Sequence, residues 1–108
     1  MKRVLPVRIP VYINTKIVAN GKNYDGIIGN LSKNGAFVEI IPTMTVTPFV
    51  PPKKLDLKFQ ENSKKTHTLK CEIAWLYTKR NSSNNLISSI GVKIINPSPA
   101  YKKYFKAL

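Results

Sequence analysis

The chain has 108 residues, the length of one domain with a modest hydrophobic core and too short for two such cores. Hydrophobic residues make up 43% of it and charged residues 21%, a composition that argues against disorder. Eighteen Lys and Arg residues against five Asp and Glu residues give a formal net charge of +13, which favours anionic partners: nucleic acid, a nucleotide or a membrane surface. Most of these cations are lysines, which also serve as ordinary surface residues, so charge alone does not choose among the partners.

The single cysteine, Cys71, excludes an internal disulfide and a cysteine-based zinc site. No apolar run approaches the roughly 18 residues of a membrane span, and the basic start at residues 1–6 is not followed by an apolar run of signal-peptide length. We therefore expect a cytoplasmic protein without a membrane span.

The first half of the chain shows the alternation of half-buried strands. Between residues 8 and 20 the odd positions are apolar, with Thr15 as the exception, and most even positions are polar. Asn20-Gly21 is the dipeptide that type I′ hairpin turns prefer, so residues 24–29 are expected to return as the second strand. A third strand follows at residues 36–41 and is stopped by Pro42.

The second half predicts three more strands and a helix. Residues 42–52 form a proline- and threonine-rich connection; residues 55–60 and 69–78 alternate as the fourth and fifth strands; and residues 86–95 form the sixth after a basic loop at 79–85. Ser98-Pro99 is a helix start, and the apolar residues of the segment 97–108 share one face: Tyr101, Tyr104, Phe105 and Leu108. The fold expected is all-β, a small six-stranded antiparallel barrel with a short C-terminal α-helix, because closure hides the edges of a small sheet.

Groups that could catalyse a reaction show no recognisable motif. His67 stands alone at a Lys- and Thr-rich strand entrance, where we expect an exposed side chain, and the five carboxylates lie on separate elements. Cys71 alternates with Ile73 and Trp75, so we expect all three to face the core. General acid-base chemistry needs converging groups, and no spacing here predicts convergence. We expect no enzyme, no metal and no cofactor.

The turn Asn30-Leu31-Ser32-Lys33-Asn34-Gly35 carries polar groups at fixed offsets. The amide of Asn30 and the hydroxyl of Ser32 can bond the edge of a nucleobase, and Gly35 permits a positive φ angle and a close approach of the backbone to a flat ligand. The alternative is a turn whose side chains bond only their own backbone.

An arm that holds two of the three arginines, Arg3 and Arg8, precedes the first strand. The planar guanidinium suits bidentate contacts to phosphate or to the acceptor edge of guanine, and it can stack on a base. The arm and the Asn-x-Ser-x-x-Gly turn therefore point together to a nucleotide.

These two features resemble the PilZ domain, the bacterial receptor module for cyclic di-GMP. The stretches "RIPV", "AFVEI", "IAWLY" and "IGVKII" agree with that family, and the resemblance covers nearly the whole chain. It implies a single domain with a split barrel over residues 1–108, in which residues 1–8 are the arm and residues 97–108 the helix.

The resemblance also implies a site and a mechanism. Asn30 and Ser32 would bond a guanine, Gly35 would keep the turn open to it, and Arg8 and Arg3 would grip phosphates and stack on bases. Binding would swing the arm over the barrel and present a new face to an effector protein. Four lysines are further candidates to line the site: Lys2, Lys16, Lys33 and Lys93.

Two alternatives remain open, the first because of one departure from the family and the second because of the net charge of +13. Arg3 and Arg8 are five positions apart, whereas the two arginines of the family's arm are four apart, and residues five apart in an extended chain do not share a face. The chain would then be a PilZ-like interaction adaptor that binds no nucleotide, with the "TPFVPP" loop and Phe49 as an exposed contact. The other alternative, and the less favoured, is single-stranded nucleic acid stacked on Tyr12, Trp75 or Tyr77, which we expect to lie mainly in the core.

Overall fold

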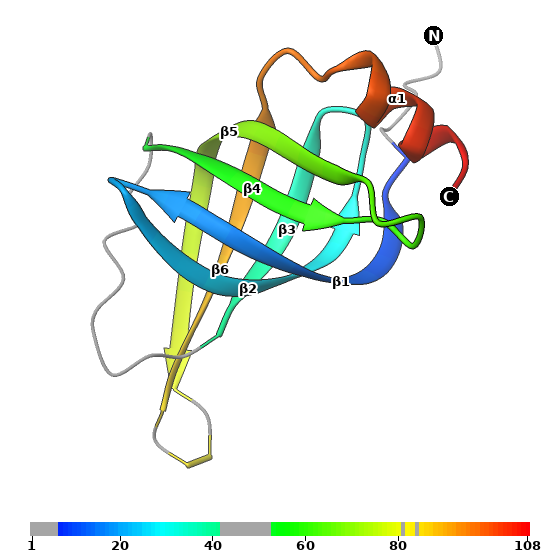
Figure 1. Cartoon of the computed structure of the whole chain (residues 1–108). Coiled ribbons are helices and arrows are strands. Elements are labelled where there is room, and N and C mark those ends of the chain that lie inside the picture. The colour runs from blue at the N-terminus through cyan, green and yellow to red at the C-terminus, as the bar shows by residue number, and fades with distance from the viewer. Residues whose placement is uncertain (1–6, 42–52, 81, 84) are drawn as a thin grey trace, which may run out of the picture.

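The computed structural model describes residues 7–41, 53–80, 82, 83 and 85–108. Its strands are β1 (Ile9–Ala19), β2 (Lys22–Leu31), β3 (Gly35–Ile40), β4 (Lys54–Gln60), β5 (Thr66–Arg80) and β6 (Leu86–Ile94), and they are followed by helix α1 (Pro99–Lys106). All neighbouring strands are antiparallel, and the order β1-β2-β3-β6-β5-β4 closes through pairing of β1 with β4 (Figure 1). The six-stranded antiparallel barrel with a C-terminal helix is confirmed.

The first hairpin forms at the predicted dipeptide. Asn20 and Gly21 have φ angles of 52° and 74°, the left-handed values that a type I′ turn requires at both central positions. The strand that returns is longer than predicted, because it begins at Lys22 and extends to Leu31. Asn30 therefore belongs to the end of β2 rather than to the turn after it.

The barrel interior is filled by the inward-facing residues of all six strands and by one helix residue. Its buried hydrophobic residues are Ile17, Ala19, Ile28, Leu31, Ala36, Val38, Ile40, Leu55, Leu57, Phe59, Leu69, Cys71, Ile73, Ile90, Val92, Ile94 and Tyr101.

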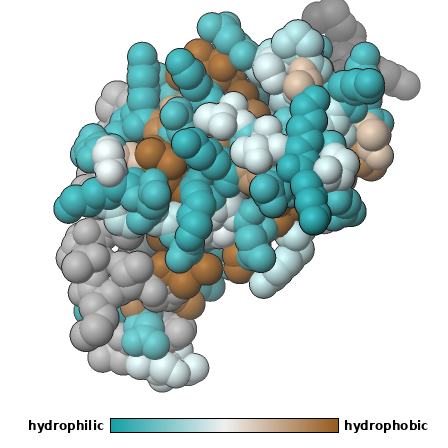
Figure 2. Space-filling view, viewed as in Figure 1, coloured by the Kyte–Doolittle hydropathy of each residue, from teal (hydrophilic) through white to brown (hydrophobic). Residues whose placement is uncertain are grey.

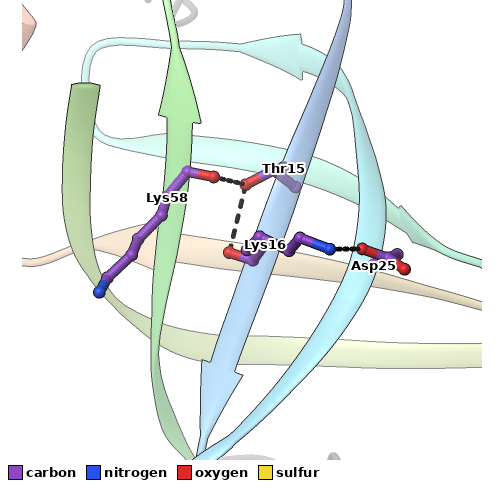
Figure 3. A network of polar contacts seen from close by, with 4 residues as sticks. All are labelled: Thr15, Lys16, Asp25 and Lys58. Carbon is purple, nitrogen blue, oxygen red and sulfur yellow. Dashed lines mark hydrogen bonds and ion pairs between the residues drawn. The ribbon is translucent and has the colours of Figure 1, made fainter. Parts of the chain in front are cut away.

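Thr15, the exception in the apolar alternation of β1, also faces inward. Its hydroxyl donates a hydrogen bond of 2.9 Å to the carbonyl oxygen of Lys58 on β4, which removes the cost of burying a polar group (Figure 3). On the outward side, Lys16 forms an ion pair with Asp25 of β2.

Helix α1 lies across the end of the barrel next to the β2–β3 turn (Figure 1). The hydroxyl of Ser98 accepts a hydrogen bond of 3.1 Å from the backbone amide of Tyr101, and Pro99 occupies the first turn, as predicted. Tyr101 is fully buried, and Tyr104 and Phe105 pack against the core. Leu108 lies beyond the end of the helix and is 45% exposed, so its predicted place on the packed face is wrong.

His67 is buried, and the prediction of an exposed side chain is wrong. Strand β5 begins at Thr66, so His67 takes an inward position opposite Phe59, with 4% of its surface exposed. Its ring lies 5.2 Å from that of Phe59 and 5.0 Å from that of Tyr104 on α1. Helix α1 thus covers His67, although the residues next to it in the sequence are polar.

Trp75 lies outside the barrel, contrary to prediction. The register of β5 on β6 shifts between Ile73 and Trp75, and this extra residue reverses the alternation, so Cys71 and Ile73 remain inside while Trp75 turns outward. Trp75 is 42% exposed, and Tyr12 and Tyr77 are 78% and 59% exposed, so none of these aromatics belongs to the core.

The β5–β6 hairpin continues beyond the barrel at the end opposite α1 (Figure 1). Because β5 extends to Arg80, Lys79 and Arg80 belong to the strand and not to the loop that was predicted at 79–85.

On the face formed by β1 and β4, hydrophilic side chains cover most of the surface, with small hydrophobic areas between them (Figure 2). Among the described residues, no helix is long and apolar enough to cross a membrane.

Candidate functional site

The β2–β3 turn with the strand ends that flank it, residues 30–35, is called the corner here. The backbone amide of Ser32 donates a hydrogen bond of 2.9 Å to the carbonyl oxygen of Gly35, and the hydroxyl of Ser32 donates to the same oxygen at 3.3 Å. Asn30 and Ser32 are both half-buried. The turn therefore bonds its own backbone and also leaves polar side-chain atoms exposed to solvent.

Gly35 is required by packing and not by an unusual backbone angle. Its φ angle is not in the left-handed region, so the expectation of a positive φ is wrong. A Cβ atom at this position would lie 2.9 Å from the carbonyl oxygen of Val92 and 3.4 Å from the Oγ atom of Ser32. The glycine lets β3 pair closely with β6 while the Ser32 hydroxyl sits against it.

Arg8 reaches the same corner through the pairing of β1 with β2. Ile9 is opposite Leu31 and Pro10 is opposite Asn30. The two strands are antiparallel, so the next position beyond these pairs brings Arg8 opposite Ser32. Arg8 is exposed. The structure thus brings Arg8 together with Asn30, Ser32 and Gly35, whereas Arg3 lies outside the described residues.

The corner is anchored from behind by α1 and β6. The hydroxyl of Tyr101 donates a hydrogen bond of 2.7 Å to the carbonyl oxygen of Ser32, and the amide of Ile94 donates one of 2.8 Å to the carbonyl oxygen of Asn34. Burial raises the pKa of the Tyr101 phenol, which keeps it a neutral donor at physiological pH. These two hydrogen bonds hold the turn against α1 and β6.

The exposed groups at the corner suit a flat polar ligand with negative charge. The Ser32 hydroxyl uses its proton on Gly35, but its oxygen still has lone pairs that can accept from a base N–H. The Asn30 side chain offers both a donor and an acceptor, and the guanidinium of Arg8 offers a planar array of donors with a positive charge.

Three of the four candidate lysines are among the described residues, and two of these lie at the corner. Lys33 lies in the corner and is exposed, and Lys93 is opposite Gly35 in the pairing of β3 with β6. Lys16 pairs with Asp25 far along β1, so it does not line the corner. Lys2 is outside the described residues.

The sequence did not reveal two aromatic residues that lie on the outer face beside Asn30. Pairing aligns Asn30 with Phe37 on β3, Phe37 with Gly91 on β6, and Gly91 with Trp75 on β5. The signal that could have found Trp75 is the glycine opposite it, because an aromatic ring often covers a glycine on a neighbouring strand.

Groups capable of catalysis are not gathered at the corner. Burial, followed by the charge of Asp56, raises the pKa of the Cys71 thiol to about 12, so a thiolate is negligible at neutral pH. Glu61 is hydrogen-bonded to His67, which α1 covers, and Asp25 forms an ion pair with Lys16. Within the described ranges no three His, Cys, Asp or Glu side chains are grouped as metal ligands.

The chain is thus a small closed barrel in which Asn30, Ser32 and Arg8 occupy neighbouring positions at the ends of β1 and β2. The family model of the PilZ domain matches residues 3–108, and the chain belongs to that family. No curated protein matches the chain at a significant level.

Solved structures share the fold at low sequence identity. The PilZ domain of YcgR from Escherichia coli, solved with c-di-GMP, has a TM-score of 0.75 and 10% identity over 97% of this chain and 87% of that chain. MotI/DgrA, the Bacillus subtilis inhibitor of motility, has a TM-score of 0.71 and 12% identity over 96% of this chain and 47% of that one. PlzA from Borreliella burgdorferi, in complex with c-di-GMP, has a TM-score of 0.63 and 14% identity over 93% and 50%. The chain thus spans about half the length of MotI/DgrA and PlzA.

Proposed function

We propose that this chain is a receptor domain for cyclic di-GMP and not an enzyme. Membership of the PilZ family supports the proposal, and two structures of the same fold, those of YcgR and PlzA, contain this nucleotide. The observation that carries the proposal is the register of β1 on β2, which sets Arg8 beside the corner that holds Asn30 and Ser32.

Each chemical part of the ligand has a counterpart at the corner. Asn30 and Ser32 bond the polar edge of one guanine, and Gly35 allows the Ser32 hydroxyl to lie against the strand behind it. Arg8 contacts a phosphate and stacks on a base, and Arg3 supplies a second guanidinium from the arm. The net charge of +13 attracts the doubly anionic ligand over a longer range.

The response to the ligand is a change at the arm. Binding draws residues 1–8 across the corner, and the arm with its adjoining barrel surface forms a new face for an effector protein. The anchored corner supports this proposal, because Tyr101 and β6 hold the turn in place, so the turn itself needs little ordering when a ligand binds.

Calorimetric titration with cyclic di-GMP tests the proposal, with two arginine variants that lower the net charge equally. Arg8→Ala should weaken binding roughly ten- to a hundredfold, since a charge-assisted hydrogen bond contributes about 1.5–3 kcal/mol. Arg80→Ala, on the hairpin at the far end of β5, should leave the affinity nearly unchanged. Equal losses in both variants, or no heat from folded wild-type protein at about 100 μM ligand, would contradict the proposal.

The amide spectrum of the protein locates the contacts. Added cyclic di-GMP should shift the signals of Arg8, Asn30, Ser32 and Gly35 first, and those of residues 1–7 with them. Small shifts spread over lysine-rich surface would indicate charge screening instead.

A PilZ-like adaptor that binds no nucleotide is the second candidate, because the β5–β6 hairpin exposes several large apolar side chains. Trp75, Leu76, Tyr77 and Leu86 are 42%, 36%, 59% and 49% exposed. The five-residue spacing of Arg3 and Arg8 also favours it. A partner complex that responds neither to cyclic di-GMP nor to Arg8→Ala would support the adaptor.

A further inference from the structure

The pairing of β1 with β4 is the shortest in the barrel. Strand β1 pairs with β2 along most of its length, but it pairs with β4 only at Lys16, Ile17 and Val18. Strand β4 continues to Gln60, where its other side is still paired with β5. In the described part of the chain, the side of β1 that faces β4 therefore has no partner strand before Lys16.

Two contacts of β4 mark the place where this pairing ends. The hydroxyl of Thr15 donates a hydrogen bond of 2.9 Å to the carbonyl oxygen of Lys58 (Figure 3). The next residue of β4, Phe59, packs against Tyr104 of α1, with the two ring centroids 5.7 Å apart. Toward α1 the strand thus packs against the helix and no longer pairs with β1.

An open cleft of about 1190 Å³ lies at this place. It is bordered by β1, by the end of β4 with the β4–β5 turn, and by α1, which lie at the same end of the barrel (Figure 1). Ile13 and Tyr104 are partly buried in its lining, whereas Tyr12 and Leu108 are 78% and 45% exposed. The cleft thus offers apolar side chains next to an unpaired strand edge.

The charges of the cleft favour an acidic occupant. Both carboxylates of its lining already have partners, since Asp25 is ion-paired and Glu61 is hydrogen-bonded to His67. Lys65 and Lys103 also line the cleft and are exposed, and neither forms an ion pair with another described residue. A negatively charged group in the cleft would give both ammonium groups a partner.

We propose that the cleft binds an extended acidic segment of a partner protein, which adds as a strand to the unpaired side of β1. The N–H and C=O groups of a sheet edge pair readily with another extended chain, and strand addition is a recurring mode of peptide recognition. Alternate side chains of the segment would face the apolar lining, and its carboxylates would reach Lys65 and Lys103. This proposal does not depend on nucleotide binding at the corner.

A bulge and a proline restrict where such a segment pairs. The register of β1 on β2 shifts between Pro10 and Ile13, and proline has no N–H to donate. The regular part of the unpaired edge is therefore short and lies at Ile13 to Thr15. A short edge selects against indiscriminate strand pairing, so the lysines and the apolar lining are required for binding.

Two other anionic occupants fit the cleft less well. A single-stranded nucleic acid can contact the lysines and stack on Tyr12, but it has no N–H and C=O groups at the spacing of a strand. An anionic membrane surface attracts lysines, but it does not enter a cleft that is bordered by three elements. The unpaired edge thus favours a polypeptide.

Selection from a phage-displayed library of random peptides, with the folded full chain as bait, tests the proposal. The enriched peptides should contain an excess of Asp and Glu that alternate with apolar residues. Their synthetic versions should bind at about 0.15 M salt and shift the amide signals of Ile13, Asn14 and Lys65 first. No enrichment, enrichment of neutral or basic peptides, or shifts confined to other surfaces would overturn the proposal.

Methylation of peptide N–H groups separates strand addition from attraction by charge alone. In an added strand, alternate N–H groups of the peptide face β1 and the others face away from it. Methylation of one alternate set in an enriched peptide should abolish binding, and methylation of the other set should retain most of it. Equal effects of the two sets would contradict strand addition.

Variants test the role of the two lysines. The double variant Lys65→Gln with Lys103→Gln should weaken peptide binding roughly two- to thirtyfold, as expected for the loss of two exposed ion pairs. Lys54→Gln with Lys79→Gln removes the same charge at the start of β4 and the far end of β5, and it should change affinity by at most about twofold. Equal losses in the two folded variants would contradict the proposed contacts. If the Lys65 and Lys103 variant lost binding of an oligonucleotide or of phosphatidylglycerol vesicles, and no peptide bound, the cleft would belong to that anion instead.

Discussion

The sequence alone offers two explanations for the glycine at position 35. A glycine in an Asn-x-Ser-x-x-Gly turn suggests a positive φ angle or a close approach of ligand to backbone, yet the residue has neither a left-handed angle nor open space around its Cα. The carbonyl oxygen of Val92 lies where a side chain would begin. A sequence reveals that a Cβ atom is missing, but it does not reveal which atoms occupy the space.

Gly35→Ala should therefore destabilise the protein in the absence of any ligand. The added Cβ atom would meet a backbone oxygen at 2.9 Å, and a backbone in a paired strand yields less easily than a side chain. We expect a loss of about 1–3 kcal/mol in the free energy of unfolding, measured by urea denaturation.

Lys33→Ala is the matched control in the same turn, since Lys33 is exposed, and its stability should stay within about 0.5 kcal/mol of wild type. If Gly35→Ala were as stable as wild type and lost only nucleotide binding, the glycine would act through the ligand and not through packing.

The strands illustrate what periodicity can and cannot predict. The alternation of apolar and polar residues, together with the Asn20-Gly21 turn, predicted every strand. Successive side chains of a half-buried strand point to opposite faces, so apolar residues recur at every second position. The register shift between Ile73 and Trp75 has no such signature, so the face on which Trp75 lies was predicted wrongly. The corner residues came from a motif resemblance, while the placement of Phe37 and Trp75 on one outer face depends on pairings between strands that are distant in sequence.

Helix α1 supports the corner through a single hydroxyl. Tyr101→Phe should remove the hydrogen bond that the fully buried tyrosine donates to the carbonyl oxygen of half-buried Ser32. We expect a loss of about 1–2 kcal/mol in the free energy of unfolding, together with weaker binding of cyclic di-GMP. Tyr104→Phe, one turn along the same helix and half-buried, should retain nucleotide affinity. Unchanged stability and affinity in Tyr101→Phe would show that the helix does not position the corner.

The β4–β5 turn carries a pH-dependent contact at the helix end of the barrel. The hydrogen bond with His67, at 2.9 Å, and then that from Ser63 hold the pKa of Glu61 below its usual value of 4.5. A carboxyl whose pKa is lower in the folded state contributes stability that is complete above the unfolded value and is lost as the pH falls through the folded value. The stabilisation should therefore be present above about pH 5 and decline below pH 4.5.

Urea denaturation at a series of pH values tests this contact, because Glu61→Gln cannot lose a proton in that range. The unfolding midpoint of wild type should fall more steeply below pH 4.5 than that of the variant. Lys65 and the phenol of Tyr104 also lie near Glu61, but the largest contribution is the His67 hydrogen bond. Parallel curves for the two proteins would contradict the assignment to Glu61.

At the scale of the whole molecule, the net charge of +13 acts on folding as well as on ligands. Compaction brings the lysines closer together, so self-repulsion destabilises the folded state. The described ion pair between Lys16 and Asp25 is exposed and offsets little of it. Added salt screens this repulsion, since the Debye length falls from about 30 Å at 0.01 M to about 8 Å at 0.15 M.

Thermal unfolding should therefore shift to higher temperature as NaCl rises from about 0.01 to 0.15 M at neutral pH. A double variant, Lys22→Gln with Lys58→Gln, removes two exposed charges away from the corner and should show a smaller shift. A midpoint that falls with salt would mean that local ion pairs outweigh the general repulsion. Because any anion relieves this repulsion at low salt, a stabilising effect of cyclic di-GMP there is not evidence of a site. Only stabilisation that persists near 0.15 M salt and is lost in Arg8→Ala but not in Arg80→Ala belongs to the corner.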